Sequence, residues 1–478
     1  MNKLARRAWR SPTLLTWLSL AVRLSGVVVV LPLVLHRFPV AEVAVWQLFS
    51  SILALILVLD LGLSPTFSRL FAYAAGGARI EDMADMRQRR SAVDDVSREQ
   101  TLQTAERLFA ALRWIYPRLA LVAVVVFAGV GTWALRRPIS QCADPTHLWL
   151  AWAAVLTGGF VAIQGNAFSA ALQGLNQLAL QRRLEIAMGA AQVLTCMLVL
   201  TFGGDLLALV LTYQAWAIAL AFGNRWLMSQ RFPEVCGSAP RRDPEVLRVL
   251  VPSAWRSGVG VVMGQGVIQA SGLVYAQIAP AAQLASYLLA LRIGTMVSQV
   301  SQAPFYSQLP RLGMLQATGD RETQLALAQL GMRRAQWVLC AGVVSVAWLI
   351  EPVLGWIGSR TAFAEPRLWA ILALALFVER FGAMHMQLYS LTNHIVWHIS
   401  NGVTGTLMIT SAVLLYPHMG VLALPAAMLL ANVVFYASYA SRLSSRAFGF
   451  RLLRFEWRAG LPAGLVMAAA LALRLAVA

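Results

Sequence analysis

The sequence predicts an all-α polytopic membrane protein, and three observations support this fold class. Of the 478 residues, 59% are hydrophobic and only 13% are charged, whereas soluble globular domains contain about 45–50% apolar and about 25% charged residues. The mean hydropathy is +0.65. The apolar residues also fall into separate runs of roughly 20, the length that a helix needs to cross a bilayer. These observations exclude an ordinary soluble protein, a disordered chain and a collagen.

Apolar runs bounded by charged residues, Pro or Gly define the individual spans. Twelve are predicted, at about 12–35, 43–66, 114–135, 148–171, 184–203, 206–224, 250–276, 283–306, 335–357, 367–391, 396–416 and 419–440. A thirteenth, at about 459–477, is shorter, and the pattern leaves open whether it crosses the membrane.

The basic residues predict the orientation. With the N-terminus in the cytoplasm, 28 of the 39 Lys and Arg residues fall in cytoplasmic segments and 5 fall in external loops. This asymmetry is what the positive-inside rule predicts, and the inverted topology would reverse it. The rule also accounts for the net charge of +18, so no nucleic-acid partner is expected.

Two groups of six spans are predicted, separated by a basic linker at 229–248 that contains three prolines. The expected domains are an N-terminal lobe at 1–228, a C-terminal lobe at 229–441, and a basic linker with a possible extra helix at 442–478. The cytoplasmic loop 67–113 is expected to be a solvated or interfacial helical connection. Weak similarity between 46–71 and 287–312 suggests pseudo-symmetric lobes, as in transporters that hold substrate between two repeats.

Polar residues recur at helical spacing on several spans. One face of the eighth span carries five of them: Arg292, Thr295, Gln299, Gln302 and Tyr306. Shorter stripes occur on the first span (Thr16, Ser19 and Arg23), on the fourth (Asn166, Ser169, Gln173 and Asn176) and on the tenth (Arg380, Gln387 and His394, with Glu379 beside Arg380). An arginine in the middle of a span costs about 2.5–3.5 kcal/mol on insertion scales, so it rarely faces lipid. We therefore predict a central, water-filled cavity with a cationic lining.

Each of these residues also has a structural interpretation. A single arginine within the membrane serves about equally often as a partner for a carbonyl or carboxylate, and Glu379 and Arg380 could form half of an interhelical pair. Asp60 could bind a proton or sodium ion, but pairing with a residue such as Arg69, or a gating role, is favoured. An excess of buried arginine over carboxylate favours an anionic cargo, because guanidinium groups bind phosphate oxygens bidentately.

Metal and cofactor sites are not expected. The four cysteines lie far apart in sequence, and His394 and His398 lack the glutamate of an HExxH motif. The external loops are short and their acidic residues are scattered, which argues against a membrane glycosyltransferase or an O-antigen polymerase or ligase. An enzyme is therefore not expected.

Three segments, 41–77, 168–186 and 285–320, resemble the second helix, the fourth-to-fifth helix junction and the eighth helix of Wzx-type polysaccharide exporters. This is the oligosaccharide-flippase branch of the superfamily that also contains MATE drug exporters and lipid II flippases. The resemblance implies two six-helix lobes, alternating access, and an undecaprenyl-pyrophosphate-linked oligosaccharide as cargo in the bacterial inner membrane. It also implies that a polysaccharide polymerase and a chain-length regulator are partners of the protein.

The same resemblance assigns cargo binding to Arg23, Arg256 and Arg292, because cationic residues on the first, seventh and eighth helices are typical of such cavities. The polar stripes add Arg380, Gln299 and Gln302 to the predicted site, with Asp60 and Glu379 as candidates for gating or ion coupling. The main alternative is a MATE-like exporter of small molecules, for which cationic cargo would favour buried carboxylates over arginine.

Overall fold

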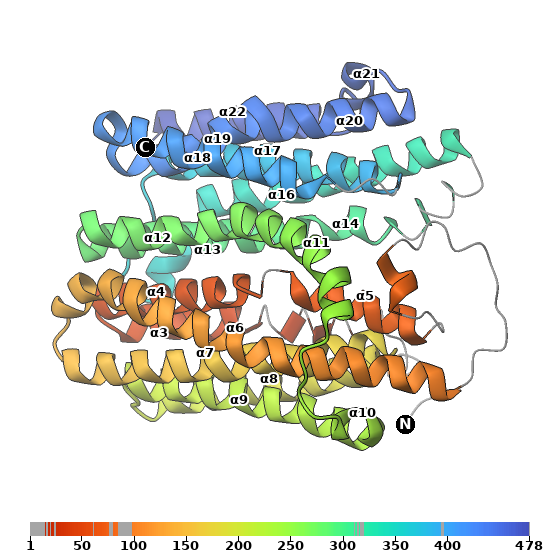
Figure 1. The fold of residues 1–478 in the computed structure, drawn as a ribbon. Helices are drawn as coiled ribbons and strands as arrows, with labels where there is room; N and C mark the ends of the chain where they lie inside the picture. The colour runs from red at the N-terminus through yellow and green to blue at the C-terminus, as the bar shows by residue number, and fades with distance from the viewer. Residues whose placement is uncertain are drawn as a thin grey trace, which may run out of the picture. The chain divides into compact units, whose positions relative to one another are not determined.

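A computed structural model describes residues 15, 18–19, 21–22, 25–60, 62–75, 80–84, 98–309, 311–312, 315, 320–392 and 396–477. These residues form helices and connecting turns, with no β-strand among them. Eight of the described helices are long and apolar enough to cross a membrane. The predicted all-α polytopic membrane fold is therefore confirmed, and Figure 1 shows the helices in chain order.

The chain divides into two compact units, Met1–Val262 and Met263–Ala478. The sequence places the junction earlier, at the linker 229–248, because charge and proline gather there. In the structure, the helix that follows this linker packs on α5 and α6 of the first unit.

Unit 1 is built around helix α7, which packs against α4, α5, α6, α8 and α9. Its described elements are η1 (Gly26–Val30), α3 (Leu31–Arg37), α4 (Val40–Val58), α5 (Leu63–Ala75), η2 (Glu81–Ala84), α6 (Arg98–Ser140), α7 (Pro145–Gly174), α8 (Leu178–Thr201), α9 (Leu206–Arg231), α10 (Pro233–Gly237) and α11 (Pro244–Val261).

Small residues let the central helices of unit 1 approach closely. A Cβ atom added at Gly165 of α7 would lie 2.7 Å from the Cβ of Ala221 on α9. Because lipid tails are as apolar as leucine, helices in a bilayer associate through such close packing rather than through hydrophobic burial. The opposite kind of face occurs on α6, where Leu121, Val122 and Val125 are 58%, 58% and 63% exposed, as expected for a surface that contacts lipid.

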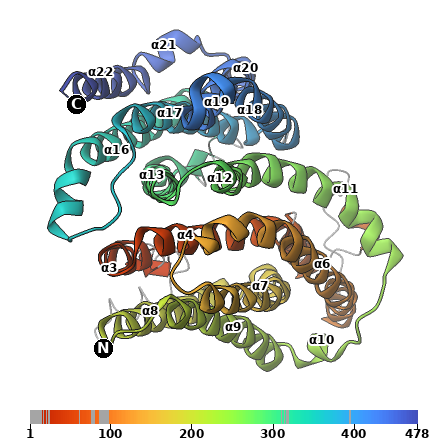
Figure 2. The same cartoon turned by 90° about the vertical axis from the view of Figure 1, so that its left-hand side faces the viewer.

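Unit 2 is organised around α17, which lies against α16 on one side and α19 and α20 on the other (Figure 2). Its described elements are η3 (Val262–Gly266, whose first residue belongs to unit 1), α12 (Val267–Ile278), α13 (Ala281–Ser301), α14 (Ala303–Tyr306), α16 (Arg321–Trp356), α17 (Pro366–Ser390), α18 (Trp397–Met419), η4 (Gly420–Leu422), α19 (Ala423–Ala431), η5 (Asn432–Ala437), α20 (Ser438–Phe448), α21 (Leu452–Glu456) and α22 (Leu461–Val477). Helix α22 is the thirteenth predicted segment, and it packs on α16 and α17.

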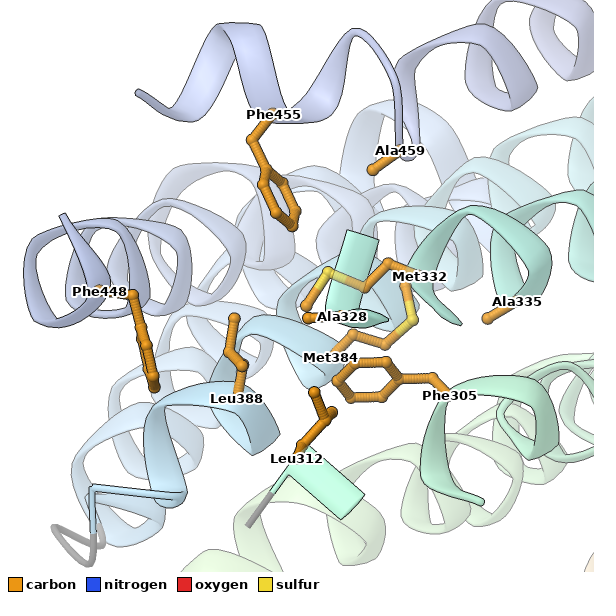
Figure 3. Close-up of a cluster of buried hydrophobic side chains, with 10 residues drawn as sticks. All are labelled: Phe305, Leu312, Ala328, Met332, Ala335, Met384, Leu388, Phe448, Phe455 and Ala459. Carbon is orange, nitrogen blue, oxygen red and sulfur yellow. The ribbon is translucent and has the colours of Figure 1, made fainter. Parts of the chain in front are cut away.

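A buried apolar cluster joins the distant parts of unit 2 (Figure 3). Side chains of α14, α16, α17, α20 and α21 point toward one another there, with Phe305, Met332, Met384 and Leu388 at most 2% exposed. This packing ties the C-terminal segment to the centre of the unit.

A tight contact also fixes the π-helical turn η3 against α18. Gly405 of α18 has no side chain, and a Cβ atom placed there would lie 2.9 Å from the backbone oxygen of Met263. Real Cβ atoms do not approach a carbonyl oxygen this closely, so the contact requires glycine.

Two boundaries differ from the sequence-based expectation. The predicted span 43–66 is interrupted between α4 and α5, because Gly62 adopts a φ of +68° that a continuous helix cannot contain. The helical connection expected over 67–113 is continuous with the neighbouring spans at both ends, since α5 continues to Ala75 and α6 begins at Arg98. Helices therefore extend beyond the apolar runs into charged sequence.

Candidate functional site

A buried arginine forms the centre of a polar cluster in unit 2. Arg380 of α17 is 6% exposed, and its Nη2 donates a hydrogen bond of 2.6 Å to the Ser298 hydroxyl of α13. Its Nη1 donates at 3.4 Å to Oε1 of Gln302. The nearest carboxylate oxygen, from Glu379, lies 3.7 Å from Nη2. Arg380 is thus held mainly by neutral acceptors, with a longer contact to its neighbour in sequence.

The two polar stripes predicted on the eighth and tenth spans meet at this cluster. Tyr306, which follows Gln302 by about one turn, lies near both Arg380 and Gln387. The structure therefore brings together Gln302 and Tyr306 from one stripe and Arg380 and Gln387 from the other. His394, the last member of the second stripe, lies outside the described residues.

The described predicted arginines other than Arg380 belong to different helices. Arg292 is half-buried on α13, and Gln299, two turns further along the same helix, is exposed. Arg256 is exposed on α11, which belongs to unit 1. Arg23 lies outside the described residues. The role of all these residues in cargo binding stays a prediction.

Asp60 occupies the interruption between α4 and α5. One of its carboxylate oxygens accepts hydrogen bonds from the hydroxyls of Tyr116 and Ser64, at 2.7 and 3.0 Å, and the other accepts from the backbone N–H of Ser64 at 2.9 Å. These bonds satisfy a free amide at the start of α5, as a helix cap does. The sequence suggested Arg69 as a partner; the contacts seen are with neutral donors.

Unit 1 contains a second polar cluster that the sequence did not reveal. Glu185 of α8 accepts a hydrogen bond of 2.8 Å from Ser19 and forms an ion pair of 2.5 Å with Arg182. Gln181 donates to Ser169 of α7 and to Glu185. Ser19 and Ser169 belong to predicted stripes, but Glu185 was placed at the edge of its span. The i,i+3 spacing of Arg182 and Glu185 is the signal that could have indicated the pair.

A third buried group lies in unit 2, away from Arg380. His385 is 1% exposed; one ring nitrogen lies 2.7 Å from the Ser444 hydroxyl, and the other lies 3.0 Å from a carboxylate oxygen of Glu456. The three residues come from α17, α20 and α21, so the group joins elements that are distant in sequence. Among the described residues, no three His, Cys, Asp or Glu side chains are grouped as metal ligands would be.

No family model and no curated protein matches the chain, but solved structures do. A multidrug-resistance MATE-family transporter of the MOP superfamily, inward-facing, aligns with a TM-score of 0.57 at 13% identity, over 91% of this chain and 98% of that one. The lipid II flippase MurJ in an inward closed conformation aligns with a TM-score of 0.57 at 10% identity, over 91% and 95%. A crystal structure of a MATE mutant aligns with a TM-score of 0.59 at 13% identity, over 94% and 98%. The chain therefore has a MATE-like fold, similar to that of MOP-superfamily transporters.

Proposed function

We propose that this chain flips an undecaprenyl-pyrophosphate-linked oligosaccharide across the bacterial cytoplasmic membrane by alternating access. The observation that carries the proposal is the buried Arg380, a guanidinium held mainly by the neutral acceptors Ser298 and Gln302. A cation retained at this depth is costly unless it has a function or a partner. The similarity in fold to a lipid II flippase supports a lipid-linked cargo.

The chemistry of the cargo explains why such a cluster is useful. Sugars and a pyrophosphate cannot enter hydrocarbon without hydrogen-bond partners, because burying unpaired polar and charged groups is prohibitively costly. Arginine binds phosphate oxygens through paired N–H donors. In this proposal Arg380, together with Arg23, Arg256 and Arg292, binds pyrophosphate, while Gln299 and Gln302 bind sugar hydroxyls. The prenyl chain stays in the lipid.

Transport further requires inward-open and outward-open states of similar free energy, biased by cargo or by an ion gradient. Asp60 and Glu379 are our candidates for that bias, because Asp60 lies at a helix interruption and Glu379 lies 3.7 Å from the Arg380 guanidinium. The flipped lipid-linked oligosaccharide would then pass to a polysaccharide polymerase and a chain-length regulator.

A MATE-like exporter of small cations is the second candidate function. The specific observation in its favour is Glu185, a half-buried carboxylate among the helices of unit 1 that the sequence did not reveal. The ion pair between Glu185 and Arg182 weakens this alternative, because the carboxylate already has a cationic partner at 2.5 Å.

Reconstitution into liposomes tests the proposal. A fluorescent lipid-pyrophosphate oligosaccharide should become accessible to an impermeant quencher or enzyme in the opposite leaflet when the wild-type protein is present. Replacing Arg380 with Gln should slow the initial rate about tenfold or more, the effect of losing one charge-assisted hydrogen bond. The matched control is Arg367→Gln at the start of α17, outside the cluster.

Both variants should elute as monodisperse proteins, which shows that they fold. Export of a cationic dye without lipid movement would identify the small-molecule exporter. Equal flipping by wild type and Arg380→Gln would refute the role of this arginine, and no flipping by the wild type would refute the proposed function.

A further inference from the structure

Unit 1 contains a cavity that has no place in the proposed flipping route. Its volume is about 460 Å³, and it lies among α6, α7, α9 and α10, all within Met1–Val262. The side chains that matter for its chemistry are Arg113, Tyr116, Gln164, Phe168, Arg225 and Cys236. A cavity of this size is far larger than a water site and falls within the range of ligand pockets.

The charge of the cavity has one sign. Arg113 and Arg225 line it, and its lining contains no aspartate or glutamate. Both guanidinium groups lie near enough to the Cys236 thiol, which also lines the cavity, to act on it electrostatically. A space bounded by two arginines and no carboxylate is suited to an anion.

The first arginine is already positioned. Nη1 of Arg113 donates to the backbone oxygens of Cys236 and Ser238, at 3.1 and 2.9 Å. These bonds fix the guanidinium against the end of α10, so little side-chain freedom is lost when its other N–H groups bind a ligand. Arg225 is exposed, and no hydrogen bond or ion pair holds its guanidinium within the described part of unit 1. It is therefore available to close on a ligand.

The rest of the cavity indicates where the anion comes from. Its wall includes the apolar surfaces of Pro117, Ala167 and Phe168. Trp226, next to Arg225, is 60% exposed, and tryptophans are enriched at the headgroup level of membranes. An apolar wall combined with a cationic rim at this level matches a lipid headgroup with its first carbons better than a free ion.

We propose that this cavity binds the phosphate of an anionic phospholipid headgroup between Arg113 and Arg225. The site goes beyond the proposed flipping function, since it lies wholly in unit 1 and uses none of the residues assigned to cargo. A negative result for lipid binding at this site would therefore leave the result of the flipping assay unaffected.

Native cysteines provide the test. Cys236 lines the cavity and is partly exposed, whereas Cys142 is also partly exposed but lies beyond the opposite end of α6. The full-length protein, in neutral detergent, is treated with N-ethylmaleimide, and modification of each cysteine is followed by peptide mass spectrometry. The probes are micelles containing phosphatidylglycerol, micelles containing phosphatidylcholine, and inorganic phosphate.

Phosphatidylglycerol should slow modification of Cys236 and leave Cys142 unchanged, and phosphatidylcholine should protect neither. The concentration for half-protection should rise about tenfold in Arg225→Gln, the effect of one lost charge-assisted hydrogen bond. It should not change in Arg136→Gln, an exposed arginine on the same helix α6 but outside the cavity. Each variant is compared with itself, with and without lipid, because removing Arg225 also alters the intrinsic reactivity of the thiol.

Protection by inorganic phosphate equal to that by phosphatidylglycerol would keep the phosphate site but overturn the lipid as its source. Equal protection by phosphatidylcholine, no protection by either anion, or unchanged half-protection in Arg225→Gln would overturn the proposal.

Discussion

At the scale of single residues, the hydrogen bonds of Asp60 link a helix interruption to a neighbouring helix. Tyr116 of α6 is 1% exposed and donates to Asp60 at 2.7 Å, while Ser64 completes the set from α5. A buried acceptor that loses its donor keeps its desolvation cost and gains nothing in return. The tyrosine therefore stabilises the interruption rather than merely filling space.

Replacing Tyr116 with Phe removes this donor and leaves the ring in place. We expect a loss of about 1–3 kcal/mol in the free energy of unfolding, the usual cost of an unsatisfied buried group. Denaturant titration of the purified protein in detergent measures it. Tyr73→Phe on α5 is the control, because its hydroxyl makes no hydrogen bond within the described residues of this unit. Equal losses in the two variants would contradict the role given to Tyr116.

The sequence could predict some of these residues and not others. Helical spacing identified Arg380 and Gln302, because each belongs to a series of polar residues that recurs on one face of an apolar helix. It could not identify Tyr116 or His385, whose partners Asp60 and Glu456 lie 56 and 71 residues away. Local patterns contain no information on such pairs; only the packing of the helices brings them together.

At the scale of the helix, apolar runs predicted where each described span lies but not where it ends. Helices α6 and α16 begin at Arg98 and Arg321, well before the apolar runs that mark their spans. Charged residues are compatible with a helix in water, so a hydropathy pattern does not detect the extension. The interruption at Gly62 was also missed, because one glycine in an apolar run need not break a helix.

Gly449 at a helix end and Gly129 in an open stretch of helix should respond oppositely to alanine. Gly449 follows α20 with a φ of +70°, and no atom lies within 4 Å of the position of an added Cβ. Gly449→Ala should therefore cost about 1–2 kcal/mol through backbone conformation alone. Gly129, inside α6, is also surrounded by open space, and Gly129→Ala should stabilise by about 0.5–1 kcal/mol. Unfolding in detergent measures both changes, and a shared sign would contradict the explanation.

The start of α11 should weaken in acid. Asp243 accepts hydrogen bonds from Arg107 of α6 at 2.8 Å and from the backbone N–H groups of Glu245 and Val246. Burial raises the pKa of Asp243, but the hydrogen bond from Arg107, the backbone N–H groups of Val246 and Glu245 and the charge of Arg107 together outweigh burial and hold the pKa below the ordinary value of 3.8. A depressed pKa contributes stability that is complete above the unfolded-state pKa and is lost as the pH falls through the folded-state pKa.

Asp243→Asn should therefore lower the thermal midpoint near pH 6, and the difference from the wild type should shrink as the pH falls below about 4. Asp320→Asn is the control, since Asp320 caps α16 through the backbone N–H of Thr323. A difference that stays constant from about pH 3 to pH 7 would exclude the ion pair with Arg107 as its cause.

At the scale of the whole molecule, the distribution of arginine predicts which ends of the helices face the cytoplasm. That orientation places Cys142 outside and Cys236 inside, on opposite sides of the membrane. Cys196 and Cys340 are buried. The two partly exposed native cysteines, Cys142 and Cys236, therefore report topology without any engineered residue.

An impermeant maleimide added to intact cells should modify Cys142 but not Cys236, and Cys236 should react only after permeabilisation. Burial and then the charge of Glu42 raise the pKa of Cys142 to about 11, so its labelling needs mildly alkaline buffer and long incubation. Cys142→Ser, which should abolish the external signal, is the control. Labelling of Cys236 from outside would contradict the predicted topology, in which Cys236 lies on the cytoplasmic side.

The contact between η3 and α18 limits the ways in which unit 2 can rearrange. Because Gly405 lies against the backbone oxygen of Met263, axial sliding of α12 along α18 would drive the side chain of a neighbouring residue into that carbonyl group. We therefore expect η3 and α18 to keep this contact, and to move together, when unit 2 rearranges.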